Sequence, residues 1–168
     1  MANLTFKGIP IRSIGNLPAV GSTAPAFKLT RGDLSDVGLD AFEGKKKILN
    51  IVMSLDTRVC ANSAIRFNKE AVAVPDTVIL NISADLPFAQ KRFCESAQVA
   101  NVVMLSTMRS PAFGKDYGVV ITDGAVAGLM SRSVLVLDRN NKVVYSEHVA
   151  EGAAEPNYDA ALAALKKI

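Results

Sequence analysis

The stretch ILNIVMSLDTRVCANSAIRF, residues 48–67, carries the strongest structural signal in the chain. Its first part, residues 48–53, is a short apolar run with β-branched residues, which is typical of a strand buried on both faces. A helix then begins near one of three candidate N-caps and runs to about Ala73. The N-cap candidates are Ser54, Asp56 and Thr57, and the residues at helical spacing on the inward face are Val59, Cys60, Ser63, Ala64, Phe67 and Ala71.

Similar signals continue toward the C-terminus and complete an α/β pattern. Asp85 and Pro87 begin a second helix that carries Cys94, because proline suits the first helical position. The order β-α-β-α-β, followed by β-β-α, predicts a thioredoxin-like fold with a central mixed sheet flanked by helices. The remaining expected elements are strands over 78–82, 102–105, 133–137 and 142–149, a broken helical stretch over 111–118 and a helix over about 157–167.

The N-terminal quarter has weaker patterns. LTFKGIPI, residues 4–11, alternates in character around Gly8 and predicts a β-hairpin. Residues 12–45 are rich in glycine and proline, which favours loops with room for one strand. Lys45, Lys46 and Lys47 are expected to form a solvated turn before the strand over 48–53.

Composition excludes several classes of protein. The 168 residues predict one domain, residues 1–168, and the hydrophobic share of 49% and charged share of 21% are ordinary for globular proteins. Two cysteines are too few for a disulfide scaffold. The net charge of +3 is spread along the chain and gives no reason to expect a nucleic-acid partner.

The protein is expected to be cytoplasmic, with the periplasm as the alternative. No apolar run reaches the roughly 18 residues of a membrane span, and the first residues lack the pattern of a secretory signal. In a reducing cytosol, paired cysteines more often indicate redox chemistry or metal binding than a structural bridge.

Cys60 is the first candidate for chemistry. A thiol in the first turn of a helix faces unpaired backbone N–H groups and the positive end of the helix dipole, and both favour the thiolate. The alternative is a small apolar side chain in the core, where free cysteine is common.

The residues before Cys60 resemble the peroxiredoxin signature Pro-x-x-x-Thr-x-x-Cys, with Thr57 and Cys60 in register and Met53 at the proline position. Other segments resemble the thiol peroxidase branch of that superfamily, so the resemblance extends from about residue 4 to residue 167. These segments are FNKE (67–70), SADLPFAQKRFC (83–94), LSTMRSPAFGKDYGV (105–119), SRSVLVLDRNNKVVYSE (131–147) and EPNYDAAL (155–162).

The resemblance implies catalytic roles for three of these residues. Cys60 would be the peroxidatic cysteine, whose thiolate attacks a hydroperoxide and becomes a sulfenic acid. The Thr57 hydroxyl would lie near the thiolate and the peroxide oxygens, and Arg132 would stabilise the negative charge. The structural alternatives are a helix cap for Thr57 and a solvated charge at a strand end for Arg132.

The resemblance also assigns a partner to Cys60. Cys94 would be the resolving cysteine of an atypical two-cysteine enzyme and would form an intrachain disulfide with the Cys60 sulfenic acid. Its alternative is core packing beside Phe88 and Phe93. A disulfide requires Cα atoms within about 7 Å, so we expect the segments around both cysteines to unwind partly on oxidation.

The implied enzyme reduces hydrogen peroxide and alkyl or lipid hydroperoxides, is re-reduced by thioredoxin, forms a homodimer and requires no metal, haem or flavin. The alternatives are a peroxide sensor that relays a disulfide to a partner protein, and a thioredoxin-fold binding module with inert cysteines. Met53 departs from the family proline, and because methionine is flexible and oxidisable we expect it to affect turnover and overoxidation. His148, the only histidine, is expected to be a strand residue and not a metal ligand. Most of five large apolar side chains are assigned to the core and not to a substrate pocket: Phe88, Phe93, Met104, Met108 and Phe113.

Overall fold

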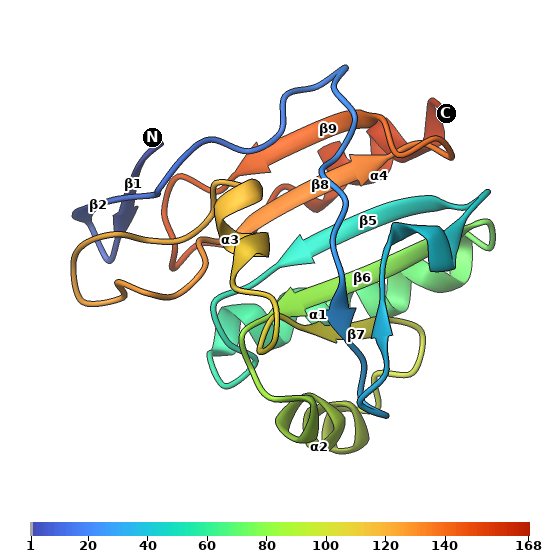
Figure 1. Ribbon diagram of the computed structural model, residues 1–168, viewed down its shortest axis with the longest axis horizontal. Helices are drawn as coiled ribbons and strands as arrows, with labels where there is room; N and C mark the ends of the chain where they lie inside the picture. Colours follow the sequence, from blue (N-terminus) through green and yellow to red (C-terminus); the bar gives the residue numbers. More distant parts are fainter. Residues whose placement is uncertain (1) are drawn as a thin grey trace.

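The computed structural model describes residues 2–168, whose centre is a seven-stranded mixed sheet (Figure 1). The strand order β4-β3-β7-β6-β5-β8-β9, with helices on both faces, confirms the predicted thioredoxin-like α/β fold. The strands are β3 (Leu29–Thr30), β4 (Asp36–Val37), β5 (Lys46–Ile51), β6 (Thr77–Ser83), β7 (Val103–Ser106), β8 (Ser133–Leu137) and β9 (Val143–His148).

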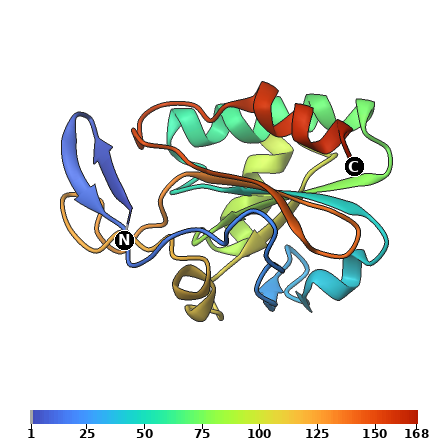
Figure 2. The same cartoon turned by 90° about the horizontal axis from the view of Figure 1, so that it is seen from above.

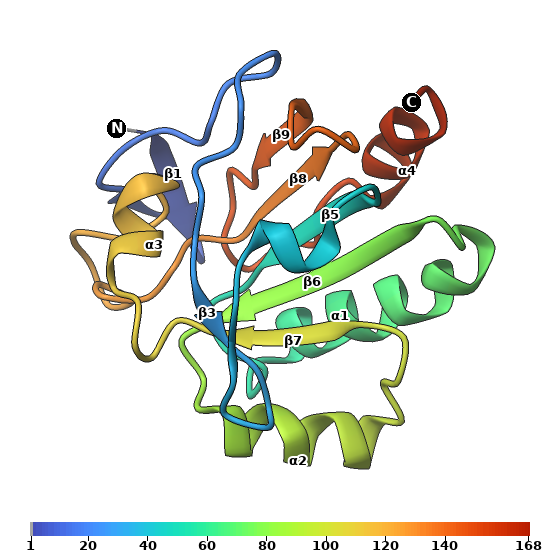
Figure 3. The ribbon, with the colours of Figure 1, turned by 45° about the vertical axis from the view of Figure 1, so that its right-hand side comes forward.

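Strands β5, β6 and β7 are parallel, and two helices connect them: α1 (Arg58–Glu70) after β5 and α2 (Pro87–Ala97) after β6 (Figure 3). Both connections step across the sheet in the same direction, so right-handed crossovers place both helices on one face. A short 3-10 helix, η2 (Ala71–Ala73), continues α1 to the predicted end at Ala73. The carboxyl ends of these strands are therefore followed by the two cysteine-bearing helices.

Strand β8 is antiparallel to β5, and this register decides what meets at the edge of the sheet. Ile51, the last residue of β5, is paired with Ser133, the first residue of β8. The residues that follow β5 and those that precede β8 are thus brought to the same edge. Strand β9 continues the sheet as the predicted hairpin, and α4 (Tyr158–Lys166) packs against both strands.

Two apolar clusters fill the spaces on either side of the sheet. Figure 2 shows α1 and α4 on one face and α3 (Ala112–Asp116) with the 3-10 helix η1 (Leu39–Phe42) on the other. The first cluster contains Cys60 and Phe67 of α1, and Cys94 of α2 packs against it. Cys60 and Cys94 therefore belong to the same side of the molecule.

The N-terminal hairpin is confirmed as a separate two-stranded sheet of β1 (Asn3–Phe6) and β2 (Ile9–Arg12). Its turn residues Lys7 and Gly8 both have positive φ values, 52° and 78°. A two-residue hairpin turn needs this geometry, and glycine adopts it without a steric cost.

The segment before β5 differs from expectation in two ways. It contains two short strands and η1, which is more regular structure than the predicted loops with one strand. The prediction of a solvated turn at Lys45–Lys47 was wrong, because Lys46 and Lys47 belong to β5 and Lys47 is fully buried. Lys47 is paired with Val78 on one side and Leu137 on the other, at the centre of the sheet, where a sequence rich in lysine gives no hint of a core position.

No helix within residues 2–168 is both long and apolar enough to cross a membrane.

Candidate active site

Cys60 lies in the first turn of α1, with its side chain fully buried. Thr57 occupies the N-cap position in an extended conformation, and the Ala61 N–H donates to its carbonyl at 2.9 Å. One turn further on, the Ser63 hydroxyl donates to the Cys60 carbonyl at 3.0 Å. The thiol is therefore held by an intact helix start, where unpaired N–H groups favour a negative charge.

The Thr57 hydroxyl does not cap α1. It donates to the Ser54 carbonyl at 2.9 Å, and its oxygen accepts no hydrogen bond from the helix. Of the three N-cap candidates, Thr57 therefore occupies the N-cap position, but its side chain makes no capping hydrogen bond. Because the hydroxyl proton is used locally, the oxygen lone pairs of this exposed residue remain able to accept a hydrogen bond from a bound molecule.

Arg132 is buried to 1% exposure, although it lies directly before β8, so the alternative of a solvated charge is wrong. Its Nη2 donates to the carbonyl of Gly152 at 3.1 Å. Within the described chain, Nε and Nη1 have no hydrogen-bond partner. Buried guanidinium groups are normally paired, so two free donors at one position indicate a group kept for a ligand or an anion.

A cavity of about 540 Å³ joins these groups, because Thr57 and Arg132 both contribute to its wall. Met53 and Val59 line it as well, so it reaches the turn between β5 and α1. Cys60 itself is fully buried and is not part of the cavity wall. The wall is mainly apolar, with the cations of Lys7 and Arg58 at positions that the sequence did not suggest. The remaining lining residues are Phe6, Val126, Leu129, Gly152 and Ala153.

Two parts of this cavity were not predicted from the sequence. Phe6 and Lys7 come from the N-terminal hairpin, and Val126 and Leu129 come from the loop before β8. Their approach depends on long-range packing, for which a single sequence contains no spacing signal. The register of β5 with β8 brings Arg132 to the end of β5, and the sequence indicated this position only through the family resemblance.

Cys94 lies in the last turn of α2, half-buried, and both cysteines are free. Burial raises the pKa of the Cys94 thiol, and the neighbouring Glu95 raises it further. The helix ends at Gln98 in the left-handed conformation, with φ 55°, and the N–H of Val99 donates to the Cys94 carbonyl at 3.0 Å. Phe93 is half-buried in the same cluster, whereas Phe88 is 65% exposed, so the expectation that Phe88 packs in the core is wrong.

Asp85 connects the two cysteine-bearing segments. One carboxylate oxygen accepts from the Ser54 hydroxyl at 2.8 Å, and the other accepts from the Leu55 N–H at 2.8 Å and the Ser83 hydroxyl at 2.8 Å. Ser54 and Leu55 precede α1, and Asp85 precedes α2. The sequence indicated Asp85 only as the start of a helix, so this link between the two elements was missed.

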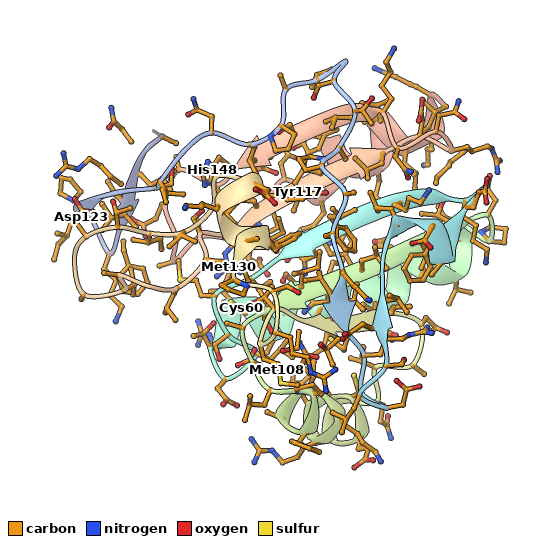
Figure 4. All side chains as sticks on the ribbon, viewed as in Figure 1. Cys60, Met108, Tyr117, Asp123, Met130 and His148 are labelled. Carbon is orange, nitrogen blue, oxygen red and sulfur yellow. The ribbon has the colours of Figure 1, made fainter. Side chains whose placement is uncertain are left out.

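The other candidates lie outside the cavity. His148 contacts the Ser131 hydroxyl through Nε2 and lies apart from Cys60 in Figure 4. Burial lowers the pKa of His148 to about 4. Met104 and Phe113 are in the core, and Met108 lines a different cavity. Among residues 2–168, no group of three histidine, cysteine, aspartate or glutamate side chains could hold a metal ion.

Comparison with known proteins places this arrangement in a family. The model of the Redoxin family matches residues 19–162. A thiol peroxidase of Mycobacterium tuberculosis and one of Mycobacterium bovis are each 52% identical over 165 residues, covering 98% of this chain and 99% of each relative. A crystal structure of a peroxiredoxin-like protein from Aquifex aeolicus is 35% identical with a TM-score of 0.93, covering 99% of this chain and 97% of that one.

A thiol peroxidase from Chromobacterium violaceum is 26% identical with a TM-score of 0.89, covering 98% of this chain and 95% of that one. These relatives span the whole β-sheet and both cysteine-bearing helices of the present chain. The chain belongs to the Redoxin family, in its thiol peroxidase branch, and is an oxidoreductase of the peroxiredoxin type.

Proposed function

We propose that this thiol peroxidase reduces hydrogen peroxide and organic hydroperoxides through Cys60, forms an intrachain disulfide with Cys94 and is re-reduced by thioredoxin. The observation that carries the proposal is a cavity at the start of the Cys60 helix, lined by a free threonine oxygen and by a buried arginine with two unpaired donors. The Cys60 thiol lies buried one residue beyond Val59 of the cavity wall. Each of these groups has a use in attack on an O–O bond.

In the first step the Cys60 thiolate attacks the terminal oxygen of the hydroperoxide, and the O–O bond breaks. The terminal oxygen and its proton stay on sulfur, which is oxidised to the sulfenic acid. The leaving oxygen takes a proton from solvent and departs as water or an alcohol. Negative charge moves from sulfur to the leaving oxygen, and the free Arg132 donors can stabilise that charge on either atom. The Thr57 hydroxyl oxygen accepts a hydrogen bond from the O–H of the hydroperoxide and thereby orients the substrate.

Organic hydroperoxides suit the walls of the cavity. Phe6, Met53, Val126 and Leu129 present apolar surface around the approach to Thr57. Burial of an alkyl group there contributes binding free energy of roughly 25 cal/mol per Å² of apolar area removed from water. We therefore expect tert-butyl hydroperoxide to have a lower KM than hydrogen peroxide.

In the second step the Cys94 sulfur attacks the sulfenic sulfur, water leaves and the disulfide forms. Cys60 is in the first turn of α1 and Cys94 in the last turn of α2, so both helix ends must open for the sulfur atoms to meet. Asp85 joins the loops before both helices while the cysteines are free, and we expect these hydrogen bonds to persist during the change.

A dithiol of the thioredoxin type completes the cycle by attacking the disulfide, leaving two reduced cysteines and its own disulfide. A homodimer is part of the same proposal. Its support is the exposure of several large apolar side chains at the start of α2 and the loop after β7, where two copies would cover them. These side chains are Leu86, Phe88 and Met108.

The test is intact mass after one equivalent of hydroperoxide. The reduced chain should lose two hydrogens, and Cys94→Ser should gain one oxygen at Cys60. An unreactive Cys60 would overturn the proposal, and reaction without fast turnover by thioredoxin and its reductase would favour the peroxide relay.

A further inference from the structure

Glu151 lies in the loop between β9 and α4, and its carboxylate accepts four hydrogen bonds. The N–H groups of Ala153 and Lys7 donate to Oε1 at 2.8 and 2.9 Å. The N–H of Gly8 and the hydroxyl of Thr5 donate to Oε2 at 3.0 and 2.9 Å. Three of these donors belong to the N-terminal hairpin, so one side chain joins two segments from opposite ends of the chain.

Backbone hydrogen bonds align the same two segments around the carboxylate. The Thr5 N–H donates to the Ala150 carbonyl at 2.8 Å, and the Gly152 N–H donates to the Thr5 carbonyl at 2.7 Å. Thr5 and Glu151 form an isolated parallel bridge. The hairpin is thus fixed to the loop over 150–153 by its own backbone and by the Glu151 side chain.

Both segments reach the cavity that Thr57 and Arg132 line. Phe6 and Lys7 of the hairpin and Gly152 and Ala153 of the loop line its wall. The carbonyl of Gly152 also accepts the hydrogen bond from Arg132 Nη2 at 3.1 Å, and the other guanidinium nitrogens have no partner within the described chain. The direction in which Arg132 presents its free donors therefore depends on the position of Gly152.

We propose that Glu151 is a positioning residue of the peroxidase reaction, which holds the Gly152 carbonyl and the hairpin so that Arg132 faces the thiolate and the cavity keeps its shape. The inference rests on the proposed function of Cys60 and Arg132. Glu151 itself does not line the cavity, and it acts through the hairpin and the loop over 150–153.

The ionic state of Glu151 agrees with this role. The N–H donors of Ala153 and Gly8 lower the pKa of the carboxyl to about 2, and Lys7 and Thr5 contribute less; together these hydrogen bonds outweigh desolvation, which acts in the opposite direction. The carboxylate is consequently charged across the pH range in which a thiolate reacts, and it offers only acceptors to the four donors.

The variant Glu151→Gln tests the inference because it keeps the size of the side chain but replaces one acceptor oxygen by an NH₂ donor. We expect the rate of Cys60 oxidation by tert-butyl hydroperoxide, measured by stopped flow, to fall about tenfold through misplacement of Arg132. The pH midpoint of Cys60 alkylation, measured in a Cys94→Ser background, should move to higher pH because the guanidinium stabilises the thiolate less well.

Glu155→Gln is the matched control, since it removes the same charge from the same connection between β9 and α4. Glu155 is exposed, and within the described chain its carboxylate accepts only from the Tyr158 hydroxyl, at 3.3 Å. Its rate and alkylation midpoint should equal those of the unaltered chain. If Glu151→Gln does not fold, Thr5→Val, which removes one donor, should show the same two changes at smaller size. A folded Glu151→Gln with an unaltered rate and midpoint overturns the inference, whereas an unaltered chain that does not react with peroxide overturns the proposed function itself.

Discussion

The Ser54 hydroxyl donates to the Asp85 carboxylate at 2.8 Å, and this contact joins the loop before the helix of Cys60 to the start of the helix of Cys94. The second carboxylate oxygen accepts from the Leu55 N–H and the Ser83 hydroxyl. Both loops lie at the carboxyl ends of neighbouring parallel strands, where α/β sheets commonly place their sites. The loops before the two cysteine-bearing helices are thus joined to each other, so the unwinding that a disulfide needs must occur beyond them, in the first turn of α1 and the last turn of α2.

Asp85→Asn should weaken this junction. An amide offers one acceptor oxygen in place of two, so at least one donor loses its partner, and we expect the free energy of unfolding to fall by about 1–3 kcal/mol. Urea denaturation measures this loss. Asp56→Asn is the control, because Asp56 is exposed and the guanidinium of Arg92 lies 4.0 Å from its carboxylate. This variant should change the free energy of unfolding by no more than about 0.5 kcal/mol. Equal stabilities of the two variants would show that the junction contributes nothing.

Met53→Pro should raise the rate at which Cys60 reacts with peroxide. Met53 is buried and lines the cavity. Its Cε methyl packs against Gly152, only 2.6 Å from the point that a Cβ on that glycine would occupy. A proline ring fixes φ and removes this mobile, oxidisable group, which we expect to increase the rate between about twofold and tenfold. The disulfide should still form.

Stopped-flow oxidation with hydrogen peroxide measures the rate, and peptide mass spectrometry measures sulfoxide at position 53. Met53→Leu separates the two effects, since it removes the sulfur but keeps a flexible side chain. It should abolish the sulfoxide and leave the rate unaltered. A rate for Met53→Pro equal to that of the unaltered chain means that this position does not influence the reaction.

The sequence predicted the sheet and its two cysteine-bearing helices because those elements depend on local patterns. The apolar run over 48–53 and the helical spacing of Cys60 and Phe67 each lie within one short window. Thr57 and Arg132 were identified through resemblance, and their nearness follows from the pairing of Ile51 with Ser133. Such long-range pairing has no signature within either segment.

Other features could not be predicted for the same physical reason. Lys7 and Glu151 come from opposite ends of the chain and meet through a hydrogen bond. The two free donors of Arg132 result from the absence of acceptors around a buried side chain. Lys47 reads as polar, yet it occupies the centre of the sheet between Val78 and Leu137. In each case tertiary packing decided the environment, and residue type did not.

Lys47→Met should stabilise the protein. Lys47 is fully buried, and its Nζ has no hydrogen-bond partner within residues 2–168. Burial lowers the pKa of this amine, although Asp138 and Glu43 act in the opposite direction. A methionine fills a similar volume without an unpaired charge, so we expect the free energy of unfolding to rise by about 1–2 kcal/mol at pH 7.

Urea denaturation at pH 7 and pH 10 checks this prediction. The folded-state pKa of Lys47 is the lower one, so the cost of burying its charge declines as the pH rises through that value, and the gain from Lys47→Met should shrink at pH 10. Lys46→Met is the control, because Nζ of Lys46 lies 3.5 Å from the Asp76 carboxylate and already has a partner. A loss of stability in Lys47→Met would show that the buried amine has a favourable interaction.

Cys94 should make the reduced protein less stable in alkali. Burial, and then Glu95, raise the pKa of its thiol in the folded state above the ordinary value of about 8.5. The folded chain therefore holds this proton more tightly than the unfolded chain. The contribution of the protonated Cys94 thiol to the free energy of unfolding is fully present below the ordinary thiol pKa. It is lost as the pH rises through the higher pKa of the folded state.

Urea denaturation of Cys60→Ser, in which Cys94 is the only thiol, measures this contribution between pH 7 and pH 10. Its free energy of unfolding should fall more steeply over this interval than that of the double variant Cys60→Ser with Cys94→Ala, because alanine does not titrate. Thiolate absorbance at 240 nm should also titrate at higher pH in the folded Cys60→Ser variant than in urea. Identical curves in the two solvents would mean that the last turn of α2 already leaves Cys94 open to water, and the resolving step would then need no unwinding at that end.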